Sequence, residues 1–214
     1  MFVKTKLKDG KMKAVNILIR VLLLGVIIAL VYFIITGIQK PIDFEVQRNE
    51  RFGKVIQRLS DIRTAQVEYK DHYGHYTPDF DTLIHFIKTE TMPVIFAIGS
   101  VPDTLTERKA VELGIITRDT TYIPLIDTLF NHIDYPIDRL RFIPVGTKAE
   151  FRMDTATVPT GSGIFVKVFE ARINNWDILN GLNEQLIINY NSEKDSVLKV
   201  GSLETANNNA GNWE

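Results

Sequence analysis

The sequence contains no cysteine, which excludes disulfide bonds, thiolate metal sites and cysteine nucleophiles together. It also lacks an excess of charge of either sign, because 25 lysines and arginines stand against 26 aspartates and glutamates, and the formal net charge is −1. Nucleic-acid-binding domains usually carry a basic surplus. We therefore expect no nucleic-acid partner.

Recognisable catalytic motifs are also missing. The chain has no Gly-x-Ser-x-Gly or His-Glu-x-x-His, and Gly146-Thr147-Lys148 lacks the other glycines of a phosphate-binding loop. Two histidines and three aspartates crowd one turn: Asp71, His72, His75, Asp79 and Asp81. Without a further fixed ligand, His-x-x-His at a helix end is typical of a solvated turn. We predict no metal, no cofactor and no enzyme activity, although catalytic groups distant in sequence can still meet in space.

A long apolar run is present near the N-terminus. Residues 21–38 contain no charged side chain, and as a helix they span about 27 Å, close to the hydrocarbon thickness of a bilayer. The side chain of Arg20 can reach the interface, which extends the predicted transmembrane helix to residues 15–39. A buried core helix is the alternative, but core helices rarely stay apolar on every face for so long.

A cleaved signal peptide is a second alternative. It requires a shorter apolar region, of roughly 7–15 residues, followed by a small-x-small cleavage site. Residues 36–41 contain no such site, so the sequence favours a helix that is retained.

The cations around this helix predict its orientation. Six precede the uncharged residues 21–38 and only Asp9 opposes them: Lys4, Lys6, Lys8, Lys11, Lys13 and Arg20. The positive-inside rule then places residues 1–14, a short basic segment, in the cytoplasm. We predict a bacterial inner-membrane protein with a cytoplasmic N-terminus and a periplasmic C-terminal domain.

Beyond the membrane, Pro41 predicts a break or kink, and an amphipathic helix follows at about residues 44–73. Its apolar stripe can pack on the domain's own sheet or pair with another chain as a short coiled coil. In the second case the residues that make the association are Phe52, Val55, Leu59, Ile62, Tyr69 and Tyr73. We expect protein partners or a homo-oligomer, in addition to the membrane.

The remaining pattern predicts an α+β fold for residues 40–204, with helices first and an antiparallel β-sheet at the C-terminal end. Asp79 or Asp81 can cap a short helix that ends at Lys88. We expect a buried strand at 93–98, helices at 105–113 and 176–182, and strands at 140–145, 149–157, 163–173, 185–190 and 197–203. Residues 205–214 are predicted to form a poorly ordered polar tail.

A membrane helix, an amphipathic extension and a C-terminal antiparallel sheet together resemble type IV pilin-like proteins and the pseudopilins of secretion systems. The segment at 62–70, followed by Tyr73-Gly74-His75-Tyr76-Thr77-Pro78, is similar to their passage from helix to loop. The resemblance covers roughly residues 21–90. It departs from those families at the processing site, because Gly10 is followed by Lys11-Met12-Lys13-Ala14-Val15, without a glutamate at the fifth position.

Six triplets of the form Asp-(Ser/Thr)-x follow the apolar run, and none precedes it. The pattern is similar to the O-glycosylation sequon that some Gram-negative bacteria use on periplasmic proteins. Aspartate–threonine pairs are also common in caps and turns. The residues that would carry a glycan are Thr82, Thr104, Thr120, Thr128, Thr155 and Ser196.

From these patterns we expect a structural or assembly component of a secretion, transport or pilus-like machinery, held at the periplasmic face of the inner membrane. Two alternatives stay open. One is a membrane-tethered periplasmic enzyme or ligand-binding domain with a cleft near His72 and His75. The other is a subunit of an intramembrane complex, suggested by the small residues Gly25, Ala29 and Gly37.

Overall fold

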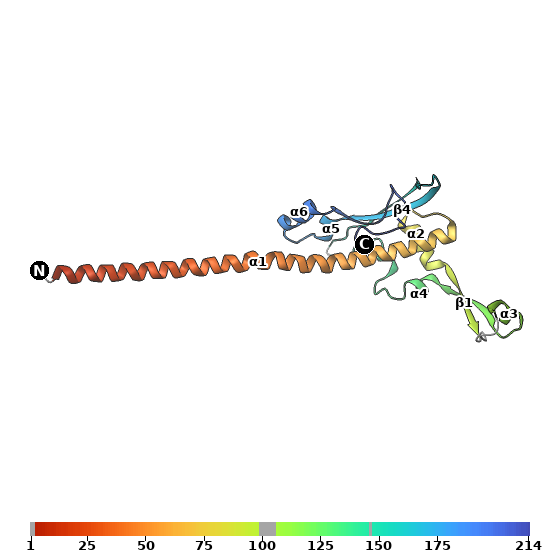
Figure 1. Ribbon diagram of the computed structural model, residues 1–214, viewed down its shortest axis with the longest axis horizontal. Helices are drawn as coiled ribbons and strands as arrows, with labels where there is room; N and C mark the ends of the chain where they lie inside the picture. The colour runs from red at the N-terminus through yellow and green to blue at the C-terminus, as the bar shows by residue number, and fades with distance from the viewer. Residues whose placement is uncertain (1–2, 99–105, 146) are drawn as a thin grey trace. The chain divides into compact units, whose positions relative to one another are not determined.

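The computed structural model describes residues 3–98, 106–145 and 147–214. Its elements follow in the order shown in Figure 1 and divide into two compact units, Met1–Glu50 and Arg51–Glu214. Helix α1 (Val3–Tyr73) contributes its first part to one unit and residues 51–73 to the other.

The expected break at Pro41 is wrong, because α1 continues through this residue. Proline has no N–H to donate to the carbonyl four residues earlier, which here belongs to Gly37. The loss is confined to one hydrogen bond, and the helical turns on both sides keep theirs.

The first unit presents its apolar side chains outward. Between Ile17 and Ile38 the large apolar side chains are 47–69% exposed. Among the described residues, one helix is long and apolar enough to cross a membrane, and it is this one.

The second unit carries the predicted C-terminal antiparallel sheet, which confirms the α+β fold. Its strands are β3 (Arg152–Pro159), β4 (Phe165–Asn174) and β5 (Val197–Gly201), in the order β3-β4-β5. Gly201, at φ +76°, allows a close approach of backbones, because a Cβ there would lie 2.1 Å from the carbonyl oxygen of Phe169.

Residues 51–73 of α1 supply one side of the core. The sheet supplies the other: the side-chain amide of Gln66 donates to the sulfur of Met153 on β3 at 2.9 Å. Helix α2 (Phe80–Thr89) adds a further wall and is capped as predicted, since Asp79 accepts a hydrogen bond from the Thr82 amide at 2.8 Å. The largest fully enclosed apolar side chains are Val55, Leu59, Ile62, Leu83, Ile87, Leu125, Leu140, Phe169, Ile178, Leu179 and Ile187.

The strand expected to be buried, at 93–98, belongs instead to a second, two-stranded sheet and is partly exposed. Strand β1 (Thr91–Ile98) pairs only with β2 (Thr117–Pro124), and Phe96 on β1 is 49% exposed. Between them lies α3 (Glu107–Glu112), and Gly114 follows it at φ +70°, as a helix stop requires. The expected start of that helix, residue 105, lies outside the described residues.

Two other expected strands are wrong. Residues 140–145 follow the short 3-10 helix η1 (Ile137–Arg139) and form turns with one bridge, Phe142 to Glu150. Residues 185–190 belong to helix α6 (Glu184–Glu193), because the side chain of Asn183 caps it by accepting from the Leu186 amide at 3.2 Å. Two short helices, α4 (Leu125–Leu129) and α5 (Asn175–Ile178), complete the unit.

The tail at residues 205–214 is not loose, contrary to expectation. The Gly201 amide donates to the carbonyl of Ala210, and the Asn212 amide donates to that of Lys199, each at 3.0 Å. The side chain of Glu214 also pairs with Arg63 on α1 at 2.6 Å. Backbone hydrogen bonds thus attach the tail to β5, and the side chain of Glu214 attaches it to the helix.

Candidate functional site

The apolar stripe predicted to associate with other chains is used inside the second unit. Val55, Leu59 and Ile62 are 0% exposed, and Tyr69 is buried. Phe52 is half-buried, with its ring 5.6 Å from that of Tyr190. Tyr73 alone of the six is exposed, at 46%. The alternative of internal packing therefore describes this helix.

Polar side chains interrupt the same stripe and form a network around Asp61, which is 2% exposed. Its Oδ2 accepts a hydrogen bond from the Tyr135 hydroxyl at 2.7 Å, and its Oδ1 accepts one from the Gln57 side-chain amide at 3.2 Å. The imidazole of His132 lies 3.1 Å from the same Oδ1. Burial and the hydrogen bond to Asp61 raise the pKa of Tyr135, so its phenol stays protonated. The network ties α1 to the segment at 130–145.

Arg58, one turn before Asp61, lines a cavity of about 460 Å³. The residue is 7% exposed, its Nη1 donates to the carbonyls of Arg139 and Phe142, and its guanidinium lies 3.4 Å from the centre of the Tyr135 ring. Burial lowers the pKa of Arg58 below its usual value, and this outweighs the raising effects of nearby acids. The other charged groups on the cavity wall are Arg139, Lys148 and Asp134.

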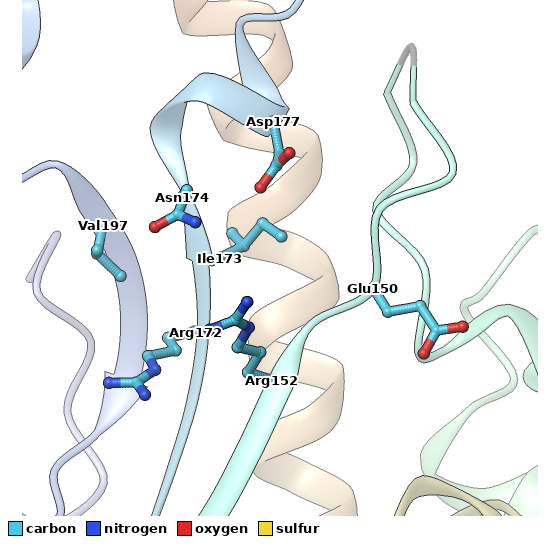
Figure 2. A pocket seen from close by; sticks show the side chains of 7 residues that line it. All are labelled: Glu150, Arg152, Arg172, Ile173, Asn174, Asp177 and Val197. Carbon is cyan, nitrogen blue, oxygen red and sulfur yellow. The ribbon is translucent and has the colours of Figure 1, made fainter.

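A second polar cavity, of about 240 Å³, lies on the outer face of the three-stranded sheet (Figure 2). The register places three cations in one row across the strands: Arg152 opposite Arg172, and Arg172 opposite Lys199. Glu170 accepts from Arg172 at 3.3 Å and from Lys199 at 2.9 Å. Arg152 extends from β3 over β4 and has no hydrogen bond or ion pair with any described residue. A carboxylate thus compensates part of this row.

The turn rich in histidine and aspartate does not gather into a ligand set. His72 approaches Glu90 at 3.9 Å, and the ring of His75 contacts the carbonyl of Tyr73 at 3.0 Å. Asp79 caps α2, whereas Asp81 pairs with Arg141. Within the described part of the chain, no three histidine or acidic side chains are placed to hold a metal ion.

Two of the threonines in the Asp-(Ser/Thr) triplets have structural partners. The Thr82 hydroxyl donates to Asp79 at 2.7 Å and that of Thr128 donates to the carbonyl of Pro124 at 3.1 Å. Thr120, Thr155 and Ser196 are exposed, and Thr104 lies outside the described residues. Glycosylation at these positions stays a prediction.

Sequence reasoning does not single out Arg58, Arg139 or Lys148. One signal was available: Arg58 stands three residues after Val55 and four before Ile62, which is a stripe position. The rest required the fold, because the bond from Arg58 to the carbonyl of Arg139 joins residues 81 positions apart.

The fold belongs to the architectural class of an α+β unit joined to a long apolar helix. Comparisons with protein-family models, curated proteins and solved structures found no match. The proposals below therefore rest on the chain's own geometry.

Proposed function

We propose that this chain is a single-pass protein of the bacterial inner membrane, anchored by residues 15–39. Its second unit lies in the periplasm and acts as a structural or assembly component of a secretion, transport or pilus-like machinery. The observation that carries the proposal is the outward apolar surface of residues 17–38, with large side chains 47–69% exposed. Each such side chain favours an apolar environment by about 1.5–3 kcal/mol when fully transferred from water.

The orientation is supported by the charges that flank this surface. Five lysines and one acid precede it, Arg20 lies in its first turn, and cationic flanks favour the cytoplasm. The second unit, which holds the sheet and all the cavities described above, then follows the helix on the opposite side.

A structural role is supported by apolar side chains that the second unit leaves exposed. Ile164, in the turn between β3 and β4, is 65% exposed, and Phe165, the first residue of β4, is 71% exposed. Tyr73 is exposed at the end of α1. The apolar stripe of α1 packs inside the second unit. These exposed residues therefore take its place as the proposed surface for association. Exposed aromatic and aliphatic side chains are common anchors of protein interfaces.

Site-specific photocrosslinking in native membranes tests this role. A photoreactive residue at Phe165 is expected to give a discrete crosslinked band, either with a second copy or with another membrane protein. The same residue at Thr157, which is exposed on β3 two residues before that strand ends, is the control and is expected to give a weaker band. If neither position crosslinks above background in the native membrane, the assembly role is contradicted.

A further inference from the structure

The cavity beside Arg58 contains a buried positive charge that has no described carboxylate at ion-pair distance. Of the five N–H groups of this guanidinium, the Nη1 group makes both hydrogen bonds, to the carbonyls of Arg139 and Phe142. Nε and Nη2 donate to no described residue. Neither atom is among the enclosed, unbonded polar atoms of the described residues, so neither is fully enclosed, and Arg58 lines the cavity.

Asp61 and Asp134 interact with this charge electrostatically but do not form an ion pair with it. Asp61 accepts hydrogen bonds from Tyr135 and Gln57, and its other neighbour is His132. No described carboxylate lies within the 4.0 Å ion-pair distance of Arg58. An unpaired buried charge destabilises a fold unless another group compensates it.

The rest of the cavity wall adds to the positive charge. Arg139 and Lys148 are exposed and form no ion pair with any described residue, and the single acid on the wall is Asp134. The cavity therefore carries three cations against one acid. At about 460 Å³ its volume falls in the range of small-ligand sites.

We propose that this cavity is an anion-binding site, which takes the phosphate or carboxylate group of a small ligand between Arg58, Arg139 and Lys148. Nε and Nη2 of Arg58 form a fork of donors. Two oxygens of a phosphate or carboxylate group can accept hydrogen bonds from this fork at the same time. The Tyr135 ring, against which the guanidinium packs, holds this fork in place. The site goes beyond the anchoring and assembly role, since neither requires a ligand.

Calorimetric titration of the full-length chain in micelles of an uncharged detergent tests the proposal. Inorganic phosphate and acetate are titrated separately, with chloride keeping the ionic strength constant. We expect saturable binding of at least one anion, and a higher unfolding temperature in its presence. Lys148→Gln and Arg139→Gln are each expected to weaken binding about tenfold, because a charge-assisted contact is lost.

Arg152→Gln is the matched control. It removes one unpaired arginine from the same unit at the sheet cavity and is expected to leave the affinity unchanged. Arg58→Lys keeps the buried charge but not the fork, so it is expected to weaken binding while circular dichroism reports an unchanged fold.

Two results would overturn the site. One is that neither anion binds saturably when its concentration reaches ten times an expected dissociation constant of about 1 mM. The other is an equal loss of affinity in Arg152→Gln and Lys148→Gln, which would indicate a general charge effect. If phosphate binds more tightly, the ligand carries a phosphate group, whereas tighter acetate binding assigns a carboxylate.

Discussion

Helix α1 places two apolar stretches in opposite environments. Residues 21–38 carry apolar side chains on every side, and the large ones are exposed, whereas Val55, Leu59 and Ile62 form a one-sided stripe and are 0% exposed. The same backbone conformation thus carries an outward apolar surface in one stretch and a buried apolar stripe in the other. An all-round apolar surface suits hydrocarbon, and a stripe suits a protein core.

The two stretches also differ in the polar and charged residues that they contain. Residues 21–38 contain no charge, but the second stretch encloses Arg58, Asp61 and Gln66 within its buried face. A protein core supplies carbonyls, hydroxyls and ring faces to such groups, and lipid tails do not. Substitutions that exchange these properties distinguish the two environments.

The largest effect is expected from charges in the first stretch. Ile27→Arg combined with Ile28→Arg puts two cations at the centre of the span, at about 2.5–3.5 kcal/mol each for membrane insertion. The fraction of protein that resists alkaline extraction from membranes should fall sharply. Ile42→Arg with Val46→Arg, also at exposed positions of α1, should extract like the wild type. Equal behaviour of the two pairs would contradict the assignment of residues 15–39.

Cavity formation in the second stretch is expected to be the next largest effect. Leu59→Ala should lower the free energy of unfolding of the second unit by about 2–5 kcal/mol, since the side chain is fully enclosed. Leu24→Ala, at a position 59% exposed, should leave that free energy unchanged. Denaturant titration in micelles, followed by tryptophan fluorescence, measures both. A similar loss in the two variants would remove the distinction between the stretches.

Gln66→Ala tests the buried polar groups. Its amide donates to the Thr77 carbonyl at 2.6 Å and its oxygen accepts from the Thr77 amide at 3.2 Å. Loss of both partners should cost about 1–3 kcal/mol of unfolding free energy. Gln47→Ala, at an exposed position in the first unit, is the control. An unchanged unfolding curve for Gln66→Ala would mean that water replaces the amide.

The smallest effect concerns pH and helix α2. Hydrogen bonds from the side chain and backbone of Thr82 lower the pKa of Asp79 below its usual 3.8. Because the folded pKa is the lower one, this carboxylate stabilises α2 above pH 3.8 and loses the effect as the pH falls through the folded value. Asp79→Asn keeps the cap without the charge. Its unfolding temperature should therefore fall less than that of the wild type between pH 7 and pH 3.

Local signals explain what the sequence predicted well. The Asp79 cap, the stop at Gly114 and strand β4 each depend on neighbouring residues. Helix α6 was mistaken for a strand because its β-branched and aromatic residues favour strands, whereas the Asn183 cap and the burial of Ile187 decide for a helix.

The cavities could not be predicted in the same way. The cation row depends on the register that sets Arg152 opposite Arg172, and no local pattern fixes that register. The Arg58 cavity depends on a loop that returns to α1 from far along the chain. In both cases the cavity depends on tertiary contacts between residues that are distant in the sequence.

The central claim is that lipid surrounds the first stretch and that the second unit lies beyond the membrane. Protease added to intact spheroplasts tests it most directly. We predict that the second unit is digested, while an N-terminal fragment containing residues 15–39 stays in the membrane and a cytoplasmic marker stays whole. A second unit that survives this treatment, or a chain that leaves the membrane fraction without detergent, would contradict the account.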